Sequence, residues 1–117
     1  MPAFDEAMAA LNELEQSGCS NTAQVKNYHT SLAVIFKRYY SRKSGTDMMN
    51  KTTGEILLTM QQYNDNGFLS KLAEALRCGD AVKFAKFLPD ADDSTGSLVR
   101  IREAIRYLEQ VHSNTKQ

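Results

Sequence analysis

Apolar residues recur at helical spacing along residues 25–43, the longest uninterrupted helical pattern in the chain. Spacings of three and four place these residues on one face of an α-helix. The residues of this face are Val25, Tyr28, Leu32, Ile35, Phe36 and Tyr39. The segment has no acidic residue, and the basic residues at its C-terminal end complement the negative end of the helix dipole. We predict that it forms the central helix of a small bundle, capped by Asn21 or Thr22 and ended at Gly45.

Two further helices are predicted in the first half of the chain. One covers residues 2–16 and opens with proline and acidic residues, which are typical of a helix start. Another begins at Thr52, which has the spacing of a capping box with Glu55. Turn-forming residues at 64–67 end this helix.

The second half of the chain predicts two more helices. The first starts at Phe68 and is broken near Gly79, where a short helix restarts and runs toward Pro89. An acidic loop, residues 90–94, leads into the last helix, and residues 112–117 are expected to fray. No segment alternates with period two. The predicted fold class is therefore all-α, a compact bundle of about five helices, one of them broken near Gly79.

The apolar stripes of these helices predict the core. The expected core residues outside the central helix include Ala7, Met8, Leu11, Leu14, Ile56, Leu57, Met60, Leu72, Leu76, Val82, Phe84, Phe87, Leu98, Ile101, Ile105 and Leu108. Met48 and Met49 are expected to cover the core from the preceding connection. Adjacent helical residues point about 100° apart, so one of Tyr39 and Tyr40 is expected near the surface.

Length and charge bound the class of protein. The 117 residues suit a single domain, and the formal net charge is zero, which gives no global attraction to nucleic acid or anionic membranes. The charge is unevenly placed, because residues 1–18 carry only acidic side chains and residues 20–46 carry only basic ones. We favour two antiparallel helices that offset each other's charge, and the alternative is a basic patch open to a partner.

Residue types that carry chemistry are sparse. His29 and His112 lie far apart, and neither has a neighbour at metal-ligand spacing. We expect His29 to be a hydrogen-bonded residue at the edge of the central helix's apolar face. Cys19 and Cys78 form no paired motif, and whether they form a disulfide stays open, although a reduced compartment is the simpler expectation. We therefore expect no catalytic residues, no cofactor and no metal, and no apolar run approaches the roughly 20 residues that span a membrane.

Four segments in this order and spacing resemble one bacterial domain family. They read PAFDEAMAALNELE, VKNYHTSLAVIFKRYYSRKSG, KTTGEILLTM and GDAVKFAKFLP. The chain resembles, over residues 2–108, the helical C-terminal domain of BatD-like proteins. The matching positions are Tyr28, Leu32, Ile35 (one place from its usual position), Arg38, Tyr39 and Tyr40; Thr52, Thr53, Glu55, Ile56 and Leu57; and Asp80, Val82, Lys83, Phe84, Ala85, Lys86 and Pro89. The chain departs from the family at residues 42–46, where two apolar anchors are missing.

The resemblance implies a place in a larger protein. BatD-like proteins are encoded with MoxR ATPases and von Willebrand A-type (VWA) proteins and are linked by name to aerotolerance. The resemblance implies that this chain is a fragment that follows a single membrane helix. The domain would then lie on the cytoplasmic face of the bacterial inner membrane. It implies no known enzymatic activity.

Our functional hypothesis is a protein-interaction domain whose partner is a MoxR-type AAA+ ATPase or a VWA-domain protein. The candidate interaction surface joins the basic end of the central helix to the turn around residue 83. Its residues are Arg38, Tyr40, Arg42, Lys43, Asp80, Lys83 and Lys86. The alternative is a nucleic-acid-binding module that uses the basic end of the central helix, against which the zero net charge argues. An enzyme has the least support, because no set of acid, base and nucleophile can be named.

Overall fold

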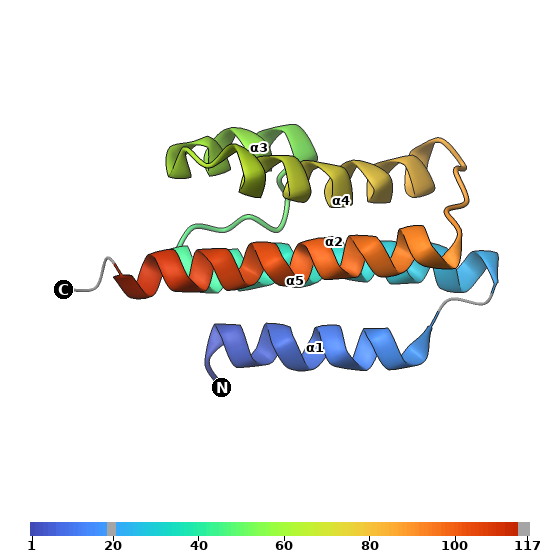
Figure 1. The fold of residues 1–117 in the computed structure, drawn as a ribbon, viewed down its shortest axis with the longest axis horizontal. Helices are drawn as coiled ribbons and strands as arrows, with labels where there is room; N and C mark the ends of the chain where they lie inside the picture. The colour runs from blue at the N-terminus through green and yellow to red at the C-terminus, as the bar shows by residue number, and fades with distance from the viewer. Residues whose placement is uncertain (19–20, 115–117) are drawn as a thin grey trace.

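The chain folds into five α-helices, and the described part contains no strand (Figure 1). The computed structural model describes residues 1–18 and 21–114, with side chains described as far as His112. The helices are α1 (Ala3–Ser17), α2 (Thr22–Ser44), α3 (Thr53–Met60), α4 (Asn66–Phe84) and α5 (Ala91–Asn114), with the 3₁₀ turn η1 (Gln61–Tyr63) after α3. The predicted all-α bundle of about five helices is confirmed.

The helices form three layers (Figure 1). Helices α2 and α5 contact each other and make the middle layer. Helix α1 packs on both from one side, α4 packs on both from the other, and α3 lies against α4. Because α2 has neighbours on two sides, more than one of its faces is buried. In the part of the chain that the structure describes, no helix is both long and apolar enough to span a lipid bilayer.

The core follows the predicted stripes. Fully buried side chains come from α1, α2, α3, α4 and α5, and they include Leu11, Phe36, Tyr39, Ile56, Met60, Leu72, Leu98, Ile101, Ile105 and Leu108. Met48 is also buried, as predicted. Met49 is 37% exposed, so the prediction that it covers the core is wrong. The prediction that one of Tyr39 and Tyr40 lies near the surface is wrong. Both are buried, because α2 is enclosed by two layers rather than one.

The predicted caps form as expected. The Asn21 side chain accepts a hydrogen bond from the Gln24 amide at 2.9 Å. Thr52 and Glu55 exchange the two hydrogen bonds of a capping box. Helix α2 ends at Gly45, which has a φ of 77° and donates its N–H to the Ser41 carbonyl.

Several helix boundaries differ from the prediction, and the helix expected to run toward Pro89 ends at Phe84. Helix α4 runs through Gly79 without a break, so Asp80 is inside the helix and caps nothing. Helix α5 already begins at Ala91, because Asp90 accepts a hydrogen bond from the Asp93 amide at 2.8 Å. Residues of the predicted 90–94 loop therefore form its first turn. The helix also continues to Asn114, so His112 is helical rather than frayed, and residues 115–117 lie outside the described part.

Phe84 and Phe87 are not core residues. Phe84 is 73% exposed and Phe87 is 45% exposed, although both were predicted to be buried. Residues two apart lie about 200° apart around any helix, so Val82 and Phe84 cannot both face the core, and Phe87 lies beyond the end of α4. In the unbroken helix, Phe84 points about 200° away from the buried Val82. Phe84 is therefore an apolar residue at a position where the helix directs its side chain toward solvent.

Candidate functional site

The structure separates the predicted interaction surface into two groups. Helices α2 and α4 run antiparallel, so the C-terminal end of α2 and the C-terminal end of α4 lie at opposite ends of the bundle (Figure 1). Arg38, Tyr40, Arg42 and Lys43 belong to the first end, and the remaining three residues, Asp80, Lys83 and Lys86, belong to the second. The two groups do not form one continuous surface.

Most of the α2 group is already engaged within the chain. Tyr40 is 3% exposed and so is not available to a partner. Arg42 lies 3.1 Å from Glu6 of α1, and Lys43 lies 3.1 Å from Glu109 of α5. Arg38 is exposed and forms no ion pair in the described part of the chain. The Arg42–Glu6 contact supports the interpretation that the acidic first helix and the basic second helix offset each other's charge.

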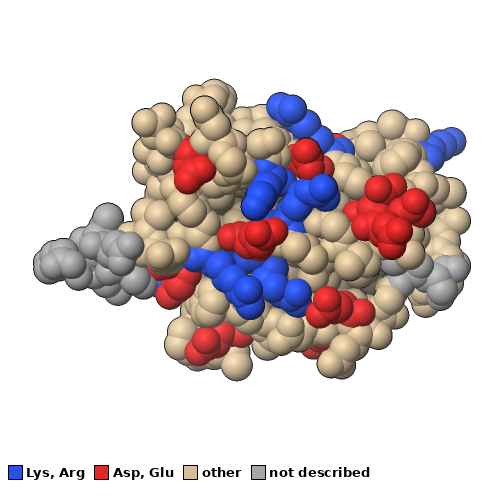
Figure 2. Space-filling view, in the orientation of Figure 1, with Lys and Arg blue, Asp and Glu red and all other residues tan. Residues whose placement is uncertain are grey.

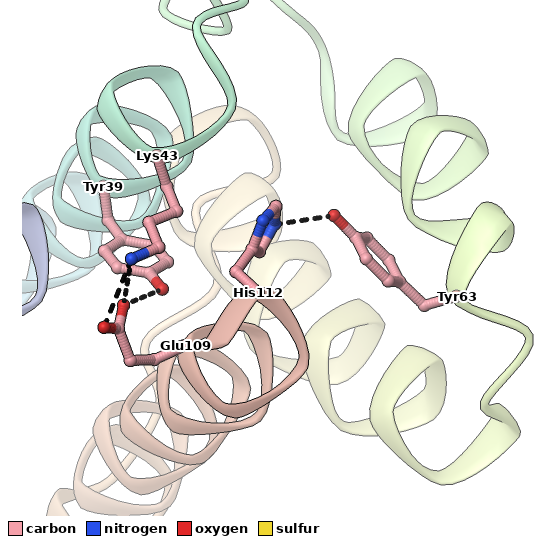
Figure 3. Close-up of polar contacts among 5 residues, drawn as sticks. All are labelled: Tyr39, Lys43, Tyr63, Glu109 and His112. Atoms are coloured by element: carbon pink, nitrogen blue, oxygen red, sulfur yellow. Dashed lines mark hydrogen bonds and ion pairs between the residues drawn. The ribbon is translucent and has the colours of Figure 1, made fainter. Parts of the chain in front are cut away.

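A hydrogen-bonded carboxylate joins α2 to α5 near the C-terminal end of α2 (Figure 3). The Tyr39 hydroxyl donates to Glu109 at 2.8 Å, and the Lys43 ammonium lies 3.1 and 3.2 Å from the two carboxylate oxygens. Burial and the contact with Glu109 raise the pKa of Tyr39, so it remains a protonated donor. Burial alone would raise the pKa of Glu109, but the hydrogen bonds from Tyr39 and Lys43 outweigh burial and lower it. The contacts of Tyr39 and Lys43 with Glu109 hold α2 and α5 together.

A second polar contact links η1 to the same end of α5. The Tyr63 hydroxyl lies 3.1 Å from the His112 ring nitrogen (Figure 3). It also lies 2.8 Å from the Tyr40 hydroxyl. Burial and the hydrogen bond with Tyr40 raise the pKa of Tyr63. This cluster was not predicted from the sequence. The available signal was the density of tyrosine at predicted core positions, since buried hydroxyls need partners.

His29 is buried rather than at the edge of the apolar face. It is 2% exposed, and its ring nitrogen Nε2 lies 3.0 Å from the hydroxyl of Ser94, which is fully buried on α5. Burial lowers the pKa of His29, so the ring is neutral near pH 7. The buried pair holds α2 against α5. The described residues contain no group of three His, Cys, Asp or Glu side chains placed to hold a metal ion.

Cys78 is half-buried on α4. Cys19, the other cysteine of the possible disulfide, lies outside the described residues.

An open groove lies between α2, α4 and the start of α3, and we call it the lysine groove. Its volume is 380 Å³, and it is lined by Lys37 of α2, Lys83 of α4 and Lys51 of the connection before α3. Asp80 is the one carboxylate among its lining residues. Gly79 lies at the contact with α2, where a Cβ placed on it would be 3.8 Å from the His29 carbonyl oxygen. The groove therefore brings Asp80 and Lys83 together with cations that the sequence analysis did not include.

Exposed apolar side chains gather where α4 ends, and we call Phe84, Phe87 and Leu88 the apolar cluster. They are 73%, 45% and 56% exposed. The Lys83 ammonium lies 5.2 Å from the centre of the Phe84 ring, which is cation–π distance. Phe84 also lines the lysine groove, so the groove and the cluster are continuous.

The face formed by α1, α4 and α5 has interleaved charges rather than a basic patch. Figure 2 shows positive and negative side chains interleaved on this face, without a large area of positive charge. Ion pairs account for part of the pattern: Lys71–Glu103 at 3.2 Å, Arg100–Glu74 at 2.8 Å and Arg102–Glu15 at 3.1 Å. Exposed pairs of this kind contribute little binding energy to a partner.

Comparison with known proteins returns no relative: no protein-family model, no curated protein and no solved structure matches the chain. Function is therefore inferred from the geometry of the described residues.

Proposed function

We propose that the chain is a non-catalytic protein-interaction domain whose partner contacts the apolar cluster. The observation that carries this proposal is the exposure of Phe84, Phe87 and Leu88 within five residues of one another. Contiguous exposed apolar side chains mark interaction sites, and phenylalanine is enriched at the centres of interfaces.

The backbone of this segment supports a docking role. The Phe87 amide donates to the Ala81 carbonyl at 3.1 Å, and Pro89 is buried where the chain turns toward α5. Lys86 has a φ of 58°, the left-handed region, which turns the chain sharply after α4. A partner would therefore meet apolar side chains on an ordered backbone, which reduces the entropy lost on binding.

The resemblance described above suggests the partner and the location. A MoxR-type AAA+ ATPase or a VWA-domain protein is the proposed partner, on the cytoplasmic face of the bacterial inner membrane, with the chain following an upstream membrane helix. The nucleic-acid alternative has less support, because Arg42 and Lys43 are each paired with a carboxylate. Salt-dependent retardation of a nucleic acid probe at about 50 mM salt would favour that alternative instead.

Co-purification with the MoxR-type ATPase and with the VWA-domain protein tests the proposal. The variant Phe84→Ser/Phe87→Ser should reduce the recovered complex about tenfold, since truncating central apolar contacts costs affinity. The matched control is Leu58→Ser/Val99→Ser, which removes two exposed apolar side chains from α3 and α5, 67% and 39% exposed. Both variants should keep the thermal unfolding midpoint of the parent chain. Equal recovery of complex with the two double variants would exclude the apolar cluster as the docking site.

A further inference from the structure

We infer that the lysine groove binds an acidic peptide segment of the partner that also carries apolar side chains. This inference rests on the proposed function, and it names the chemistry of the segment that lies beside the apolar cluster.

The lysine groove has more positive than negative side chains. Lys37, Lys51 and Lys83 form no ion pair in the described part of the chain, whereas Arg42, Lys43, Lys71, Arg100 and Arg102 each do. Three lysines therefore line the groove, and Asp80 is the one carboxylate among its lining residues, with Glu55 of α3 interacting with Lys51 beside it. An excess of one sign of charge in a groove raises the local concentration of oppositely charged groups and steers their approach.

Apolar residues line the groove between the lysines. Ala33, Val34, Leu76 and Phe84 give the groove apolar walls. A nucleic acid backbone would leave these walls without apolar contacts, and a flat membrane surface does not fit into a groove. An acidic segment with leucine-like side chains matches both the cations and the walls, as in other grooves that bind amphipathic segments.

The groove is already formed in the free chain. The His29–Ser94 hydrogen bond holds α2 against α5 at 3.0 Å, and Gly79 allows α4 to lie close to α2. Sites that are largely preformed bind without the cost of rearranging the fold.

The test uses the whole chain and a fluorescein-labelled peptide in which glutamates alternate with leucines. Fluorescence anisotropy measures its affinity for the parent chain and for Lys37→Glu/Lys83→Glu. The affinity of this variant should fall about tenfold, because two attractive charges become repulsive. The matched control is Lys26→Glu/Arg77→Glu, which makes the same change in net charge on exposed residues of α2 and α4 outside the groove. It should keep the parental affinity.

A second peptide separates specific binding from general attraction. Replacing its leucines with serines should weaken binding to the parent chain about tenfold, because the apolar walls lose their contacts. Equal affinity for the two peptides, an equal loss in the two charge variants, or no binding of the leucine peptide would overturn the inference. Co-purification through the apolar cluster would remain intact in those outcomes. Conversely, peptide binding combined with unchanged co-purification of Phe84→Ser/Phe87→Ser would overturn the proposed function and leave the groove assignment standing.

Discussion

Tyr39 and Tyr40 are neighbours in the sequence, and both are buried although they point about 100° apart around α2. Each hydroxyl reaches a different layer: Tyr39 donates to Glu109 of α5, and Tyr40 lies beside Tyr63 of η1. A buried hydroxyl without a partner would cost about 1–3 kcal/mol, so these contacts decide where the rings can be placed. At the scale of residues, the periodicity identifies buried positions but not the number of faces that a helix buries.

His29 gives a testable pH dependence. Burial lowers its pKa below the ordinary value of 6.5, so below pH 6.5 the unfolded chain binds a proton that the folded chain does not. Stability should therefore fall as the pH drops from about 7.5 to 5.5, with a slope of at most about 1.4 kcal/mol per pH unit. Urea unfolding of the parent and of His29→Gln measures this slope, which should shrink in the variant.

The matched control for this prediction is His112→Gln, which removes the other histidine from a half-buried position. Because the Glu109 carboxylate faces His112, this variant should not reduce the pH slope of the parent chain. A slope that persists in His29→Gln, or that disappears in His112→Gln, would contradict the assignment of the buried, neutral ring to His29.

At the scale of elements, α4 shows how packing overrides local signals. Cys78, Gly79 and Asp80 combine a helix-ending glycine with a capping residue, which predicts a stop and a restart. The helix continues because an unbroken register buries Val82 as well as Leu72 and Leu76 against the central layer. That gain exceeds the roughly 1 kcal/mol cost of glycine inside a helix. Because Val82 is buried, Phe84, which lies about 200° around the helix from it, points outward. Phe87 and Leu88 follow the end of α4, where no helical periodicity applies.

Two glycine substitutions test this account of the helices. Gly79→Ala should raise the free energy of unfolding by about 0.5–1 kcal/mol, because glycine is costly inside a helix. The added Cβ would meet the His29 carbonyl at an ordinary 3.8 Å. Gly45→Ala should instead lower it by about 1 kcal/mol, because its φ of 77° strains any residue with a Cβ. Denaturant unfolding measures both, and destabilisation by Gly79→Ala would indicate that α4 is not a regular helix at this position.

At the scale of the whole molecule, the sequence predicted the fold class, the helix count, the caps and most of the core. These features depend on local spacing and on residue types, which are visible in the chain. The packing of one helix face against another depends on residues far apart in the sequence, and it determines which residues lie together at the candidate site. The antiparallel arrangement of α2 and α4 separates Arg42 from Lys83, and it brings Lys37 and Lys51 to Lys83 instead. Only three of the seven predicted surface residues, Asp80, Lys83 and Lys86, lie at the end of α4 beside the groove and the apolar cluster.

Amide hydrogen exchange of the chain with and without its partner tests the central claim most directly. The partner is the MoxR-type ATPase or the VWA-domain protein, added at saturating concentration. The amides of residues 85–88, a segment outside α4 whose residues are exposed in the free chain, should exchange more slowly in the complex, together with those of residues 51–53 at the edge of the lysine groove. Unchanged exchange at residues 85–88, with protection confined to α1 or with no protection anywhere, would contradict the assignment of this end of α4 as the docking surface.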